Sequence, residues 1–156
     1  MKKQMKRAAG FTLIEILIVI GIIAILAAIV LVAINPARQF KQANNTQRSS
    51  NVNAILSAVG HYTVDNKGKL PTDVDTGAQE ISEALCDNLV PKYISAIPSD
   101  PTSGGKGALF SDCDDVDAGD IGYEVESDAN GRVTVSAPNT EDLSPSEPIE
   151  NIAVTR

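Results

Sequence analysis

The chain has 156 residues and a formal net charge of −7, with 20 acidic residues against 13 basic ones. This balance argues against a basic groove for nucleic acid, and the absence of tryptophan limits the chain to one modest core. The sequence has a single histidine, no nucleophile motif and no glycine-rich phosphate loop. We therefore expect neither an enzyme nor a cofactor.

An apolar stretch from Gly10 to Ile34 dominates the sequence, and Glu15 is its only charged residue. A helix from Phe11 to Ile34 would be roughly 36 Å long at about 1.5 Å per residue, enough to cross a bilayer core of about 30 Å. Four cations precede this stretch, and no A-x-A triplet ends it. The pattern differs from a secretory signal peptide, so we predict a retained membrane segment.

Small residues lie before the apolar run, where Ala8, Ala9 and Gly10 join it to the basic residues. A protease that cuts after Gly10 would remove a leader of residues 1–10 and leave Phe11 as the N-terminus. A carboxylate inside a membrane costs about 2.5 to 3.5 kcal/mol, so Glu15 needs a partner. We expect the new amine of one subunit to neutralise Glu15 of its neighbour. The alternative is a plain anchor whose Glu15 reaches the membrane interface.

The string GFTLIE at residues 10–15, after a short basic leader, resembles the class III signal of type IV pilins and of type II secretion pseudopilins. The resemblance implies that a prepilin peptidase cleaves between Gly10 and Phe11 and methylates the amine of Phe11. It also implies that Glu15 guides subunit registration as the chain forms a helical homopolymer. The implied partners are an inner-membrane assembly platform and its ATPase motor.

Two residues weaken the long N-terminal helix. Pro36 removes a helical hydrogen bond, and Gly21 costs up to about 1 kcal/mol against alanine. We predict a kink at Pro36, and the resemblance associates Gly21 and Pro36 with unwinding in a filament. Removal of the leader would take the formal charge of the chain from −7 to −11, because residues 1–10 hold four cations and no acid.

Residues 35–65 predict an amphipathic continuation of the same helix, ending near Asp65 because Gly68 and Pro71 follow. Apolar residues at three- and four-residue spacing form its stripe, which we expect to hold the head from Val52 onward. They are Phe40, Val52, Ile55, Leu56 and Val59. Polar residues take the other positions and are expected to face solvent or neighbouring subunits. They include Arg38, Lys41, Arg48, Asn51 and Asn53.

Residues 66–156 predict a globular head whose first element is a short helix from Ala78 to Leu89, closed by Pro91. Cys86 and Cys113 would lie outside the cytoplasm, where an even pair of cysteines indicates a disulfide. A bridge of this loop length stabilises a fold by roughly 3 to 4 kcal/mol on the chain-entropy model. Two thiols without C-x-x-C spacing do not favour zinc.

The acidic loop that follows contains the one metal candidate. Carboxylate oxygens suit calcium, and the candidates are Asp112, Asp114, Asp115 and Asp117. Their spacing does not fit an EF-hand loop, since the fifth and sixth positions hold Val116 and an aspartate. We expect no metal here unless several loops contribute, and a solvated acidic loop is the alternative.

Alternation of apolar and polar residues predicts a β-hairpin from Tyr123 to Val135, with its turn at residues 128–131. A long helix packed on a small antiparallel sheet gives an α+β fold. A tail rich in proline, serine and acids runs from Pro138 to Pro148 and is expected to wrap the surface or to be disordered.

These observations predict a type IV pilin, a structural subunit that polymerises through its N-terminal helix into a cell-surface filament. The precursor would cross the cytoplasmic membrane once, with its head outside. One alternative is a pseudopilin of a type II secretion or DNA-uptake system. A monomeric membrane-anchored binding protein is the other, because the same helix would anchor it.

Overall fold

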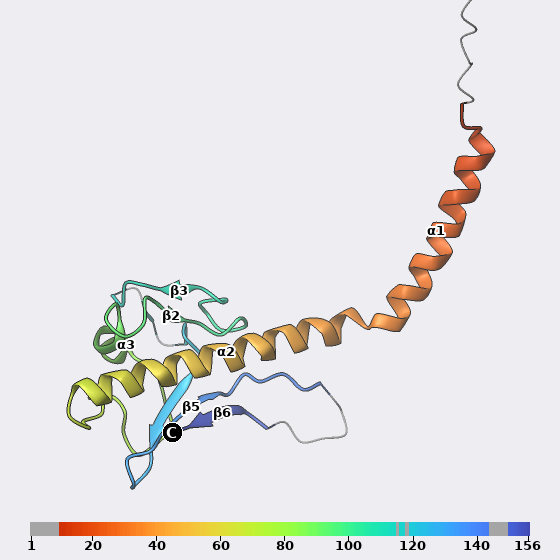
Figure 1. Cartoon of the computed structure of the whole chain (residues 1–156). Coiled ribbons are helices and arrows are strands. Elements are labelled where there is room, and N and C mark those ends of the chain that lie inside the picture. Colours follow the sequence, from red (N-terminus) through yellow and green to blue (C-terminus); the bar gives the residue numbers. More distant parts are fainter. Residues whose placement is uncertain (1–9, 115, 118, 144–149) are drawn as a thin grey trace, which may run out of the picture. The chain divides into compact units, whose positions relative to one another are not determined.

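The computed structural model describes residues 10–114, 116–117, 119–143 and 150–156 (Figure 1). The chain divides into two compact units, Met1–Gln39 and Phe40–Arg156. Because the described residues begin at Gly10, the rest of the predicted leader lies outside them.

The first unit contains the apolar helix α1, Leu13–Ile34. Its window from Leu13 to Leu31 has a mean hydropathy of 3.2, and none of that window is buried within the chain. Among the described residues, this is the one helix that is long and apolar enough to cross a membrane. The helix runs unbroken through Gly21. Apart from the helix backbone and the residues next to Gly21, no described atom lies within 4 Å of the position that a Cβ atom would take at this residue.

The expected single kinked helix is instead two helices, α1 and α2, Pro36–Asp65. Asn35 separates them in a left-handed conformation, with φ 46° and ψ 81°. The residue before a proline avoids the helical region, and asparagine tolerates positive φ better than most residues do. Pro36 then suits the first position of α2, where no N–H donor is needed. Sequence analysis identified the proline but not the conformation of Asn35.

The second unit is an α+β head, as the sequence predicts. Its four-stranded antiparallel sheet has the order β1-β4-β5-β6, and a separate two-stranded sheet pairs β2 with β3. The strands are β1, Gln79–Glu80; β2, Ile97–Pro98; β3, Leu109–Phe110; β4, Glu124–Ser127; β5, Val133–Ala137; and β6, Ile152–Thr155. The predicted hairpin is β4 and β5, with Val125 opposite Val135.

The helix expected from Ala78 is shorter than predicted: α3 runs from Glu83 to Leu89. Its N-cap is Ser82, whose hydroxyl accepts a hydrogen bond from the N–H of Leu85 at 3.2 Å. The preceding residues form β1, because pairing with β4 satisfies their backbone groups better than an extra helical turn. Sheet pairing thus overrides the local helical pattern.

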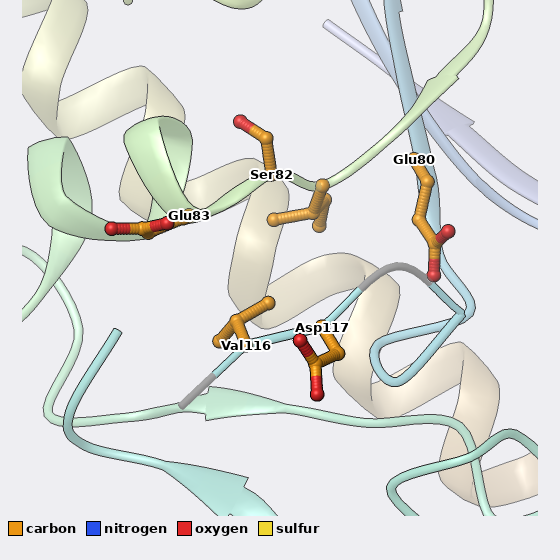
Figure 2. Close-up of a pocket in the computed structure, with 6 residues that line it drawn as sticks. Glu80, Ser82, Glu83, Val116 and Asp117 are labelled. Carbon is orange, nitrogen blue, oxygen red and sulfur yellow. The ribbon is translucent and has the colours of Figure 1, made fainter. Parts of the chain in front are cut away.

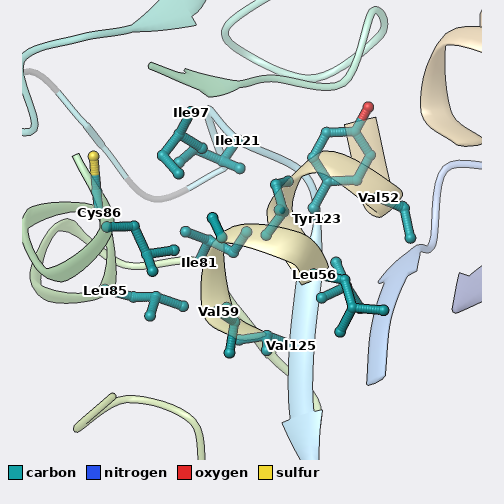
Figure 3. Close-up of a cluster of buried hydrophobic side chains, with 14 of the residues drawn as sticks. Val52, Leu56, Val59, Ile81, Leu85, Cys86, Ile97, Ile121, Tyr123 and Val125 are labelled. Atoms are coloured by element: carbon teal, nitrogen blue, oxygen red, sulfur yellow. The ribbon is translucent and has the colours of Figure 1, made fainter. Parts of the chain in front are cut away.

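The core lies between α2, α3 and the sheet (Figure 3). Val52, Ile55, Leu56 and Val59 of α2 are at most 2% exposed, which agrees with the predicted stripe. They pack in one cluster with buried residues of the other elements, including Ile81, Leu85, Ile97, Ile121, Tyr123, Val125 and Val135. Phe40, which precedes the part of the stripe expected to hold the head, is 72% exposed and lies outside the cluster.

A disulfide joins Cys86 of α3 to Cys113 in the acidic loop, with their Cα atoms 5.7 Å apart. Cys86 is fully buried, so the bridge extends from the core to this loop. It therefore fastens a segment that has little apolar surface of its own.

Candidate functional site

The N-terminal junction lies just outside α1. Thr12 is the N-cap of the helix and has extended backbone angles, φ −83° and ψ 152°. Gly10 and Phe11 precede it and are exposed, Phe11 at 83%. The peptide bond that the sequence marks for cleavage is therefore in non-helical, solvent-accessible chain, which suits attack by a peptidase.

Glu15 and Thr12 form a capping box. The Oε2 atom of Glu15 accepts hydrogen bonds from the backbone N–H and the hydroxyl of Thr12, both at 2.8 Å. In return, the N–H of Glu15 donates to the hydroxyl of Thr12 at 3.3 Å. The sequence pattern predicted a partner on another subunit and not this one, although Thr-x-x-Glu before an apolar run is a capping-box signature.

Large apolar side chains cover every face of α1 and are at least 50% exposed. The capping box holds the carboxylate at the first turn, so that the rest of the helix presents no charge. Such a surface is stable only in an apolar environment, and that environment is either lipid or other protein chains. The helix can therefore serve membrane insertion and packing between subunits.

Arg48 of α2 is fully buried, although the sequence pattern predicted an outward-facing residue. Its Nε donates to Oδ2 of Asp100 at 2.6 Å, and one terminal nitrogen donates to Oδ1 at 3.1 Å. The same nitrogen donates to the hydroxyl of Thr102, and the other binds Asn45 and Glu141. A buried guanidinium is costly unless it is paired and hydrogen-bonded, and the partners of Arg48 lie up to 93 residues away in sequence.

The electrostatics of this pair follow from competing effects. Burial alone would raise the pKa of Asp100, but hydrogen bonds from Arg48 and Thr102 outweigh it and hold the pKa below its ordinary value of 3.8. Burial likewise opposes the charge on Arg48, and its contacts with Asp100 and Glu141 raise the pKa of the guanidinium above its ordinary value. Both groups therefore stay charged near neutral pH.

The acidic loop lies beside a pocket of about 230 Å³ lined by Glu80, Ile81, Ser82, Glu83, Val116 and Asp117 (Figure 2). The Glu80 carboxylate accepts the N–H groups of Gly119 at 3.0 Å and Gly122 at 2.9 Å, so it holds the loop. Figure 2 shows the carboxylate of Glu83 pointing away from that of Glu80.

The metal candidates of the loop are not gathered into a site. Asp112, Asp114 and Asp117 are exposed, and Asp115 lies outside the described residues. Within the part of the chain that the structure describes, no three side chains of His, Cys, Asp or Glu are placed to hold a metal ion. The described part of the loop is a solvated acidic surface tied down by Glu80 and the disulfide.

Comparison with known proteins agrees with the N-terminal geometry. The family described as the prokaryotic N-terminal methylation motif matches residues 5–31. The type II secretion system core protein G of Pseudomonas aeruginosa is 32% identical over 104 residues, which are 63% of this chain and 70% of that protein. The chain belongs to the family of type IV pilins and type II secretion pseudopilins.

A second relative in this pilin and pseudopilin family is the type IV wide pilus major component PilA4 of Thermus thermophilus, which is 47% identical over 62 residues. That match covers 40% of this chain and 46% of the Thermus protein, so the chain spans about half the length of this relative. No solved structure matches the chain. Pilins and pseudopilins are structural subunits, not enzymes.

The methylation motif and the exposed apolar helix fit a membrane-anchored precursor. The structure places Gly10, Phe11 and Glu15 together at the start of α1, while Cys86 and Cys113 stabilise the head.

Proposed function

We propose that this chain is a type IV pilin that polymerises through α1 into a cell-surface filament. The observation that carries the proposal is the apolar surface of α1, which is exposed on every face, whereas the head has a closed core of its own. Lipid tails are as apolar as these side chains, so hydrophobicity alone does not choose between membrane and filament. Packing and polar contacts between helices would decide whether α1 stays in the membrane or joins a filament.

Processing by a prepilin peptidase would precede assembly. Cleavage between Gly10 and Phe11 is supported by the exposed, extended chain at this junction. The cleaved chain would begin with the amine of Phe11, which the same enzyme would methylate. The family match over residues 5–31 supports this modification.

Glu15 would register each subunit against its neighbour. The capping box directs its carboxylate toward the N-terminal end of α1, where the new amine of an adjacent subunit would bind. An opposite charge inside an apolar bundle is strongly favoured, because an unpaired carboxylate there costs a few kcal/mol. The pairing would thus allow only one stagger between neighbouring helices.

The precursor would cross the cytoplasmic membrane once, with its head outside. An inner-membrane assembly platform driven by an ATPase motor would then extract it. Gly21 and the break at Asn35 and Pro36 are the places where the helix would unwind as subunits pack, since glycine and proline weaken helices.

Mass spectrometry of the native N-terminus tests the proposal. We expect a chain that begins with N-methylated Phe11, and electron microscopy should show surface filaments that disappear when the gene is deleted. An intact leader would exclude this processing. A cleaved and methylated chain without surface filaments would exclude the pilin and favour a pseudopilin.

A second candidate is a pseudopilin of a type II secretion system. The match to core protein G favours it, because 104 aligned residues exceed the 53 residues from Leu13 to Asp65 and must reach into the head. The phenotype of a gene deletion would distinguish a pilin from a pseudopilin. Loss of surface filaments with normal protein export indicates a pilin, while exported proteins trapped in the periplasm indicate a pseudopilin.

A further inference from the structure

One polar face of α2 holds a segment from the end of the chain. Lys41, Asn44, Asn45 and Arg48 recur at three- and four-residue spacing and so share this face. All four bind Glu141 or Asp142, between 93 and 101 residues later in the sequence. Figure 1 shows the chain after β5 running alongside α2.

Asn45 recognises the backbone of this segment. Its side-chain amide donates to the carbonyl oxygen of Glu141 at 2.7 Å and accepts the N–H of Glu141 at 3.0 Å. Lys41 adds a bond from its Nζ to the carbonyl oxygen of Asp142 at 3.1 Å. These contacts hold the backbone of Glu141 and Asp142 against α2 and do not involve the carboxylate of Glu141.

The Glu141 carboxylate completes the attachment. Its Oε2 accepts from Nδ2 of Asn44 at 2.7 Å and from Arg48 at 3.1 Å. The Glu141 side chain is 26% exposed, whereas Asp100 on the same guanidinium is fully buried. Release of Glu141 would therefore leave Arg48 paired with Asp100 and the core unchanged.

Thr140 marks the other end of the segment. Its hydroxyl donates to the carbonyl oxygen of Ala137 in β5 at 2.7 Å and accepts the N–H of Ile152 in β6 at 3.0 Å. The segment is thus fixed to the sheet at Thr140 and to the helix at Glu141. Only the second attachment depends on the polar face of α2.

We propose that residues 140–142 form a strap whose closure over α2 is required for a subunit to enter the filament. The inference rests on the polymerisation proposed above. In such a filament, another copy that packs against this face of α2 would exclude water, and polar groups that lose water must already be paired. With the strap closed, Asn44, Asn45 and Glu141 satisfy one another. With the strap open, each would need a new partner in the interface.

Three variants of Glu141 test the strap in the full-length chain. Glu141→Gln keeps an acceptor for Asn44, Glu141→Ala removes it, and Glu141→Lys adds repulsion from Arg48 and Lys41. We expect hydrogen exchange at the residue 141 amide in detergent micelles to be near wild type for Gln, and at least about tenfold faster for Ala and Lys. Filament yield per cleaved subunit should fall in the same order, about fivefold or more for Lys.

Two control variants separate the strap from general stability. Glu126→Lys makes the same charge change at an exposed site on β4, and Val133→Ala loosens the core away from the strap. Both should form filaments at near wild-type yield. The strap is refuted if Glu141→Lys exchanges faster yet assembles normally, or if yield follows the melting temperature across all variants. A wild-type chain that forms no filaments would instead refute polymerisation itself, and the strap with it.

Discussion

Glu15 is the one residue of α1 that can distinguish lipid from a neighbouring subunit. Within its own chain it accepts two hydrogen bonds from Thr12, which partly satisfy the carboxylate before any external cation binds. The capping box thus accounts for how a carboxylate is tolerated at the start of an apolar helix before cleavage. After cleavage the same carboxylate would be directed at the amine of another subunit.

We predict that Glu15→Ala permits cleavage and membrane insertion but lowers filament yield at least about tenfold, the factor that corresponds to 1.4 kcal/mol. The variant keeps the exposed cleavage junction but removes the only charge of α1. Immunoblots of cell membranes and of sheared filaments measure the two steps separately. Normal filament yield would show that the pairing of Glu15 with an amine is not needed.

Arg48 illustrates a residue whose burial depends on distant partners. We predict that Arg48→Met destabilises the head by about 3 to 5 kcal/mol, because it leaves the buried Asp100 without its guanidinium. Urea unfolding of the full chain in micelles gives the free energy. The double variant Arg48→Met/Asp100→Asn should recover part of the loss, and an equally unstable double variant would contradict this account.

At the scale of single elements, the hairpin of β4 and β5 depends on its turn. Asp128 accepts the backbone N–H groups of Asn130 and Arg132 and the Nε of Arg132. The backbone contact with Arg132, followed by its guanidinium, lowers the pKa of Asp128 from 3.8 to about 2.

This lowered pKa gives a pH prediction. A carboxyl whose folded pKa is depressed stabilises the fold above its unfolded pKa and loses that effect as the pH falls through the folded value. The turn should therefore loosen between pH 3.8 and about 2, visible as faster amide exchange at Asn130 and Arg132. In Asp128→Asn these amides should lose their pH dependence in this range. An NMR titration of the Asp128 carboxyl near 3.8 would contradict the assignment.

The disulfide is the element-scale link between α3 and the acidic loop. We predict that Cys86→Ser/Cys113→Ser lowers the free energy of unfolding by roughly 3 to 4 kcal/mol on the chain-entropy model, given the separation of 27 residues. Thermal unfolding with and without reductant measures this loss. Reductant should shift the melting temperature of the wild-type chain but not that of the double variant, and an unaffected wild type would contradict the prediction.

At the scale of the whole molecule, the two units differ in whether their apolar surface is exposed or buried. The first unit leaves its apolar surface exposed, and the second buries its own behind α2 and the sheet. Because the head has a core of its own, α1 is not needed to cover it. In the filament proposed here, the acidic head would face outward, where like charges on neighbouring heads favour solubility over further aggregation.

Local patterns determined much of this in advance. The apolar run, the string GFTLIE, the stripe from Val52 to Val59 and the hairpin turn are all set by residues close in sequence, so the sequence alone predicted the family, the α+β fold and the N-terminal site. The start of α3 was wrong because Gln79 and Glu80 pair with a strand more than forty residues later.

The sequence by itself determined that α1 has no polar face, because its residues are apolar from Ile16 to Ile34 whatever the rest of the chain does. Only the tertiary structure decided which residues bind the polar face of α2. Arg48 and Asn45 look like solvent-facing residues until Asp100 and Glu141 are brought to them from 52 and 96 residues away. A buried charge depends on such long-range partners, and no local pattern records them.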